Sequence, residues 1–193
     1  MITKKQYNIT TALSAIYFLA VIWIILFKMG FSLHSIGSHR SINLIPFGAM
    51  AQRNGSDDFN EIINNIIIFM PFGIYLCMLK QEWSFIKKVA PLFLTSLALE
   101  IFQYIFAIGA TDITDLLANT LGGIIGIGIF TIFMIIFRDN TYKIVLFLAL
   151  LATVVMVVFL SFLLWANNNR QSPPRIAASQ KQLADALKYN AKM

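Results

Sequence analysis

The chain has 193 residues, of which 58% are hydrophobic and only 12% are charged, and its mean hydropathy is +0.73. Soluble domains carry about 25% charged residues, so this composition excludes an ordinary soluble protein and indicates a single integral membrane domain. The formal charge of +6 does not indicate nucleic-acid binding, because the basic residues lie in short loops and form no basic groove with interleaved aromatic residues.

Five apolar stretches follow one another along the chain, each near the roughly 20 residues that a membrane-spanning helix needs. They cover residues 10–28, 62–80, 87–108, 114–137 and 143–166. The sequence therefore predicts an all-α, polytopic membrane helical bundle with about five transmembrane helices over residues 1–166. Lys4 and Lys5 precede the first stretch, and no small-residue cleavage site follows it, so we interpret it as an uncleaved signal anchor.

The connection between the first two spans, Met29 to Glu61, is long for a membrane hairpin, and long loops often carry function. Its segment HRSINLIPFG contains Arg40, a candidate anion contact, and Asn43, a candidate ligand-binding residue. The apolar residues of the same segment favour a surface loop that covers the helix bundle. These residues are Leu44, Ile45 and Phe47.

The second span contains Pro71, which removes one backbone donor and disfavours the carbonyl of Ile67 as a helical partner. We therefore expect a kink or a local break, to which Gly73 contributes. A break would expose backbone groups to a ligand, but a tolerated kink is the commoner reason for proline in a membrane helix, and we favour that interpretation.

The fourth span opens with TDITDLLANTLGGIIGIG, in which Asp112, Asp115 and Asn119 fall within roughly 60° of one another on a helix. Such groups are costly in hydrocarbon, which favours a functional role. Gly122 and Gly126 continue this stripe and predict the close approach of another helix. The alternative is a shallow aqueous end with packing glycines, in which Asp112 caps the helix.

Polar residues mark the start of the second span, the end of the third and the start of the fourth, and alternating span directions place these ends on the same side. They are Glu61, Asn64 and Asn65; Glu100 and Gln103; and Asp112, Asp115 and Asn119. We therefore expect three helices to converge on one polar pocket.

Within this pocket the carboxylates of Glu100, Asp112 and Asp115 are hypothetical catalytic groups, because two carboxylates in different environments can act as acid and base. The candidate ligand-binding residues are Arg40, Asn43, Asn65, Gln103 and Asn119. Glu100 alternatively stays neutral and hydrogen-bonded, or pairs with an arginine. Gln103 fits a tie between helices better than a catalyst.

No metal or cofactor is predicted. His34 and His39 have no cysteine or helical histidine partner nearby, which favours solvated loop histidines over a zinc site. The pocket carboxylates are suitable ligands for magnesium, but nothing in their spacing demands it.

Basic residues near the span ends indicate the orientation of the chain. One side collects Lys4, Lys5, Lys80, Lys87, Lys88, Arg138 and Lys143. This bias favours a cytoplasmic amino terminus, with the pocket and the carboxyl tail outside, although Arg170 and Arg175 in the tail argue the other way. Residues 167–193 read as a polar linker followed by a short, basic, amphipathic helix that can touch anionic lipid or wall polymer.

Four ordered motifs between residues 40 and 130 resemble the VanZ-like family of bacterial membrane proteins. They are N-x-x-P-F (Asn43, Pro46, Phe47), N-x-x-x-F-x-P-F-G (Asn65, Phe69, Pro71, Phe72, Gly73), E-x-x-Q (Glu100, Gln103) and D-x-x-D-x-x-x-N-x-x-G (Asp112, Asp115, Asn119, Gly122). The sequence departs from the family pattern at Gly109, where many members have an arginine, and at Thr114, which replaces an acidic residue.

The resemblance implies reduced susceptibility to glycopeptide antibiotics, especially lipid-tailed ones such as teicoplanin, in Gram-positive bacteria, but it supplies no reaction. Our first hypothesis is a cell-envelope protein whose outer pocket binds a lipid-linked cell-wall precursor or a glycan, with membrane lipids as its other partners. The alternatives are a membrane hydrolase or transferase acting on a sugar- or phosphate-lipid, and a lipid or proton-coupled transporter. The sequence does not determine the oligomeric state.

Overall fold

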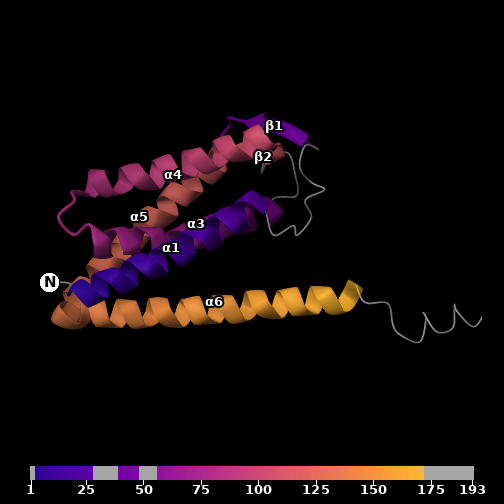
Figure 1. Cartoon of the computed structure of the whole chain (residues 1–193). Coiled ribbons are helices and arrows are strands. Elements are labelled where there is room, and N and C mark those ends of the chain that lie inside the picture. The colour runs from indigo at the N-terminus through magenta and orange to yellow at the C-terminus, as the bar shows by residue number, and fades with distance from the viewer. Residues whose placement is uncertain (1–2, 28–38, 48–55, 172–193) are drawn as a thin grey trace, which may run out of the picture. The chain divides into compact units, whose positions relative to one another are not determined.

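The computed structural model describes residues 3–27, 39–47 and 56–171. Its long helices are α1 (Lys4–Phe27), α3 (Ser56–Leu79), α4 (Phe85–Phe106), α5 (Ile113–Phe137) and α6 (Thr141–Gln171) (Figure 1). Two short strands, β1 (His39–Asn43) and β2 (Ile108–Asp112), and the 3-10 turn η2 (Arg138–Asn140) complete the described elements. The predicted helical membrane bundle is confirmed, and a two-stranded sheet is added to it.

Four stretches of the described residues are long and apolar enough to cross a membrane. They are Lys4–Ile24, Phe59–Leu79, Phe85–Phe106 and the 46-residue stretch Ile113–Val158. The last stretch contains α5, η2 and most of α6, so it holds the two helices that the sequence predicts as separate spans.

The chain forms two compact units, Met1–Ala149 and Leu150–Met193. The first contains every described element up to the first turns of α6. In the second, α6 continues through Asn167–Asn169 to Gln171, so the helix extends into the segment predicted to be a linker. The short helix predicted beyond it lies outside the described residues.

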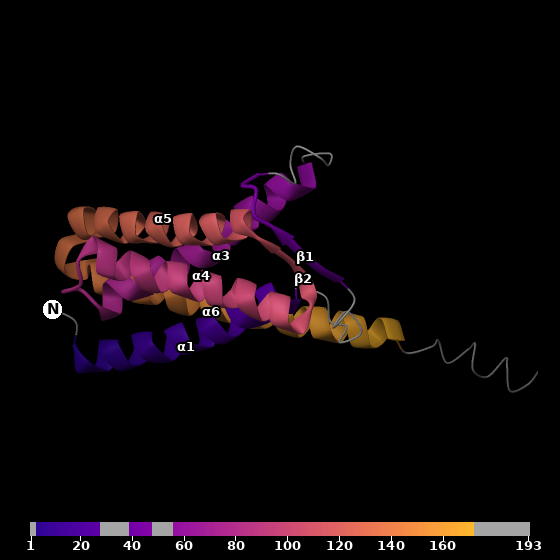
Figure 2. The same ribbon diagram turned by 90° about the horizontal axis from the view of Figure 1, so that it is seen from above.

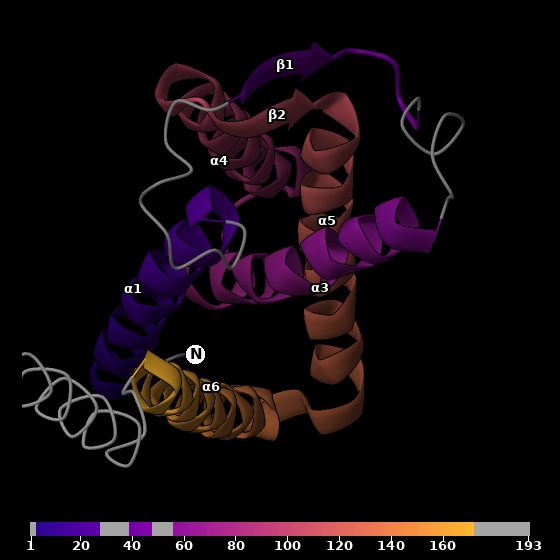
Figure 3. The same ribbon diagram turned by 90° about the vertical axis from the view of Figure 1, so that its right-hand side faces the viewer.

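Helices α3 and α5 cross in contact with each other (Figure 3). Their backbones approach so closely at glycines that a Cβ atom at Gly122 would overlap the Ile66 carbonyl, and one at Gly126 would overlap the Met70 carbonyl. This confirms the predicted close approach of another helix at the G-x-x-x-G spacing.

Pro71 lies inside α3, which continues from Ser56 to Leu79 without interruption. Of the two outcomes expected from this proline, the local break is therefore not observed. One turn earlier, the Tyr17 hydroxyl of α1 donates a hydrogen bond of 2.6 Å to the carbonyl of Ile68. This bond attaches α1 to α3 beside the proline.

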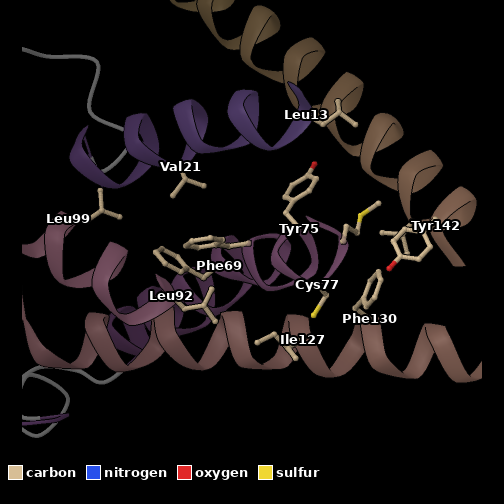
Figure 4. Packing of buried hydrophobic residues seen from close by; sticks show 13 residues of the cluster. Leu13, Val21, Phe69, Tyr75, Cys77, Leu92, Leu99, Ile127, Phe130 and Tyr142 are labelled. Carbon is tan, nitrogen blue, oxygen red and sulfur yellow. The ribbon is translucent and has the colours of Figure 1, made fainter. Parts of the chain in front are cut away.

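The hydrophobic core lies between α1, α3, α4 and α5, and it includes Tyr142 and Val145 from the start of α6 (Figure 4). Aromatic rings join α1 to α3, with Phe18 edge-on to Phe72 at a centroid distance of 4.5 Å. Phe69, which belongs to one of the sequence motifs, is completely buried here and is a core residue. In α5 the buried core residues are Ile127 and Phe130, in the carboxyl-terminal half of the helix, and in α4 they are Leu92 and Leu99.

Strands β1 and β2 pair in parallel beyond the end of α4 (Figure 2). Arg40 stands opposite Gly109, and Asn43 stands opposite Asp112. The chain leaves α4 through Ala107, whose left-handed conformation (φ 51°) ends the helix. The expectation that residues 39–43 belong to a loop is therefore wrong, and the third span ends before residue 108, because the two segments pair across a long stretch of sequence.

Candidate functional site: a polar cluster where four elements meet

Polar side chains from β1, α3, α4 and the β2–α5 junction gather at the end of the bundle that carries the sheet. We call this group the polar cluster. It consists of Asn43, Asn65, Ser96, Glu100, Gln103, Asp112, Thr114, Asp115 and Asn119. The predicted convergence of polar groups at the start of α3, the end of α4 and the start of α5 is thus observed.

Glu100 joins α4 to the strand that follows it. Its side chain is only 3% exposed, and its Oε2 accepts a hydrogen bond of 3.0 Å from the backbone N–H of Asp112. The Thr111 hydroxyl donates to the carbonyl of Glu100 at 3.2 Å. Glu100 therefore holds the strand against the last turns of α4.

Asp112 caps α5. Its backbone is extended (φ −123°, ψ 125°), and its Oδ1 accepts from the Thr114 N–H at 2.7 Å. Its Oδ2 accepts from the Asn43 side-chain amide at 3.0 Å, which connects the cap to β1. Asp112 thus precedes the helix, and the expected helical stripe is formed by Asp115 and Asn119 without it.

Asp115, in the first turn of α5, is the second buried carboxylate of the cluster. Its Oδ1 accepts a hydrogen bond of 2.8 Å from the Asn65 side chain, and this bond joins α5 to α3. Of the other polar residues expected from α3, Asn64 is exposed and Glu61 is partly buried. An acidic side chain in the first turn also interacts favourably with the positive end of the helix dipole.

Asn119 lies one helical turn further into the bundle, and its side-chain amide donates to the Ser96 hydroxyl of α4 at 3.0 Å. Both residues are buried, as is Gln103. Sequence reasoning missed Ser96. Its position in the sequence could have revealed it, because Ser96 lies one helical turn before Glu100 on the same face of α4.

Thr114 was also missed as a site residue, although its hydroxyl fixes the segment after β1. Its Oγ1 accepts from the Phe47 N–H at 3.0 Å, and Phe47 has a left-handed backbone (φ 59°). The side chains of Leu44, Ile45 and Phe47 are all more than half exposed, so they do not cover the bundle as expected. Pro46 is exposed as well.

The remaining predicted site residues lie outside the cluster or outside the described side chains. Pro71, Gly73, Gly122 and Gly126 lie in the helices, where the glycines serve the α3–α5 contact. The backbone of Arg40 is placed by β1, but its side chain is outside the described residues, as are His34 and the His39 side chain. The described residues contain no group of three or more His, Cys, Asp or Glu side chains arranged for a metal ion.

A family model described as VanZ/LLP1 matches residues 14–138. The chain is also 36% identical over 154 residues to Protein VanZ of Enterococcus faecium, and this alignment covers 78% of the chain and 92% of that protein. The chain belongs to the VanZ family. No solved structure matches it.

Membership of the VanZ family confirms the resemblance that the four motifs indicated, and together with the apolar helices it identifies a membrane protein. The matched region contains the whole polar cluster and every element that positions it. The contacts described within the cluster of this VanZ family member are hydrogen bonds between its own residues. Amide donors and carboxylate acceptors from β1, β2, α3, α4 and α5 face one another at the end of the bundle that carries the sheet.

The geometry also bears on the hypothetical acid and base. Both oxygens of Asp112 accept hydrogen bonds, one that caps α5 and one that holds β1. The Asp112 carboxylate therefore has a structural role. Glu100 and Asp115 each accept a bond from a neighbouring element while remaining at the centre of the cluster.

Proposed function

We propose that this VanZ family protein acts in the bacterial cell membrane and lowers susceptibility to lipid-tailed glycopeptide antibiotics such as teicoplanin. In this proposal the polar cluster binds a lipid-linked cell-wall precursor or a glycan, and binding alters the surface that the antibiotic meets. Kinship to Protein VanZ of Enterococcus faecium, a Gram-positive bacterium, supports the resistance role.

The observation that carries the binding role is the burial of carboxylate and amide side chains within the bundle. Glu100, Asp115 and Asn119 are 3%, 7% and 1% exposed. Polar groups in such positions cost free energy unless they are hydrogen-bonded, and apolar helices of this length pack without them. Because two separate helices, α4 and α5, contribute these side chains, we infer that the cluster is kept for recognition and not only for packing.

Charge placement supports an outer location for the cluster. Seven basic residues sit at the ends of the elements opposite the cluster, in the first turn of α1, at the end of α3 and the start of α4, and around η2, whereas Arg40 lies in β1. The seven are Lys4, Lys5, Lys80, Lys87, Lys88, Arg138 and Lys143. Since basic residues favour the cytoplasmic side, we propose a cytoplasmic amino terminus and a cluster that faces outward.

The test is expression in a teicoplanin-susceptible Gram-positive host that has no VanZ family gene, with the minimal inhibitory concentration as the readout. Asp115→Ala removes the carboxylate that binds Asn65, and we expect it to abolish protection. Asp139→Ala is the matched control, because Asp139 is exposed in η2, outside the cluster. Immunoblots of membranes must show equal amounts of both variants.

If Asp115→Ala protects the cells as well as the unaltered protein does, the polar cluster has no part in resistance. If neither variant nor the unaltered protein changes the inhibitory concentration, the resistance role itself is wrong for this chain.

A further inference from the structure

The inner end of the polar cluster contains a buried acceptor that the described residues do not satisfy. Asn119 is 1% exposed, and its Oδ1 has no hydrogen-bond partner within the part of the chain that the structure describes. A buried carbonyl oxygen without a donor is rare in proteins and calls for a water molecule or a ligand group.

A donor stands beside this acceptor. Ser96 is completely buried, and its Oγ accepts the bond of 3.0 Å from the Asn119 amide, which leaves the Ser96 O–H proton to be donated. One acceptor and one donor next to each other match a hydroxyl group, since a hydroxyl both donates and accepts. An ammonium group cannot accept, and a carbonyl cannot donate.

The surroundings define where such a group would lie. One turn toward the sheet are Glu100 on α4 and Asp115 on α5, and one turn in the other direction are Leu92 and Gly123. A Cβ at Gly123 would lie only 2.6 Å from Leu92 Cδ1, so this lower side is closed by apolar packing. The Ser96–Asn119 pair is thus the last polar layer of the cluster.

We propose that Ser96 and Asn119 form a subsite for a single hydroxyl group, which donates to Asn119 Oδ1 and accepts from Ser96 Oγ. This inference rests on the proposed function where the hydroxyl is taken to belong to a sugar head group of the ligand that the cluster binds. A water molecule held inside the bundle is the other source of the same chemistry. Glu100 and Asp115 lie between this subsite and the sheet, where the rest of a head group would be bound.

The first arm of the test uses the full chain in phosphatidylcholine nanodiscs that contain small equal amounts of glucosyl diacylglycerol and diacylglycerol. Native mass spectrometry then counts the lipids that the protein retains. If a sugar hydroxyl fills the subsite, we expect preferential retention of the glucosyl lipid and about a tenfold loss of that preference in Asn119→Leu, the size expected from one buried hydrogen bond.

Two further variants control for folding. In Ser96→Ala combined with Asn119→Leu, both partners are replaced by apolar groups, so thermal stability should be nearly unchanged while the preference is lost. Thr10→Val removes another buried hydroxyl that has no partner among the described residues, in α1, and should leave the preference intact.

The second arm detects water by proton-detected solid-state NMR of protein labelled with ¹⁵N at asparagine. A water cross-peak to the side-chain amide that disappears in Asn119→Leu, without any glucosyl preference, supports the subsite with water as its occupant. The absence of both the preference and the cross-peak overturns the subsite. A variant that loses the sugar preference but still protects cells overturns its link to resistance while the subsite stands.

Discussion

Replacing Gly122 by alanine tests the close packing of α3 against α5. A Cβ added at this position would lie 2.8 Å from Ile66 Cα and 2.9 Å from the Ile66 carbonyl carbon. Favourable contacts between carbon atoms need about 3.5–4.0 Å, so α3 would have to withdraw by about 1 Å. The obstructing atoms are backbone, and no side-chain rotation can relieve them.

The size of the destabilisation is measured against a matched control, Gly128→Ala in the same helix, where an added Cβ meets nothing within 4 Å. Both variants gain the same helix propensity, about 0.8–1.0 kcal/mol, so the difference between them isolates the steric strain. Overpacking of this kind costs about 1–3 kcal/mol. For a chain of this size that difference corresponds to a melting temperature lower by about 2–12 °C in Gly122→Ala.

The assay is thermal unfolding of both purified full-length variants in the same detergent, followed by circular dichroism and by retention of the monodisperse species. Equal melting temperatures for Gly122→Ala and Gly128→Ala would refute the backbone contact between α3 and α5. Gly123→Ala should have a melting temperature between those of the other two variants, because the atoms that its Cβ would meet belong to the flexible side chain of Leu92.

Three other outcomes are expected. Tyr17→Phe removes the bond to the Ile68 carbonyl and should cost about 1 kcal/mol of unfolding free energy in the same assay, and no change would show that this bond is not needed. Asn43→Ala removes the side-chain bond from β1 to Asp112 and leaves the backbone pairing of the strands, so hydrogen exchange should become faster in β1 but remain slow in α4, and unchanged exchange would contradict a stabilising role for this bond. A cysteine introduced at Trp83 should resist a membrane-impermeant thiol reagent in intact cells, and its labelling would reverse the proposed orientation.

The spans and the polar end of the bundle could be predicted from the sequence because hydropathy and helical spacing are local signals. Asn65, Glu100 and Asp115 stand out in apolar surroundings, and alternation of span direction is enough to bring their ends together. The parallel strands could not be predicted in the same way. Neither HRSIN nor IGATD shows the alternation of a half-buried strand, and each becomes a strand only through its distant partner.

The residues that sequence reasoning missed have a common physical reason. Ser96 and Thr114 are small hydroxyl residues that are tolerated anywhere in an apolar helix, so only their partners, Asn119 and the Phe47 backbone, reveal their place in the cluster. For Asp112 the sequence left two alternatives, a helical face and a cap, and the structure shows the cap, with the Thr114 N–H as donor. At this point the same sequence pattern fits both an aspartate that caps the helix and an aspartate that lies inside it.

The bond between Asn43 and Asp112 joins residues 69 positions apart, and this separation sets an order of events during synthesis. At about 5–20 residues per second, the ribosome needs about 3–14 s after making β1 before it makes the strand that β1 pairs with. During that interval β1 has no partner from β2, and α3 and α4 are synthesised before the cluster can exist. A nascent chain that ends before residue 108 lacks Asp112, Asp115 and Asn119 and therefore cannot assemble the polar cluster.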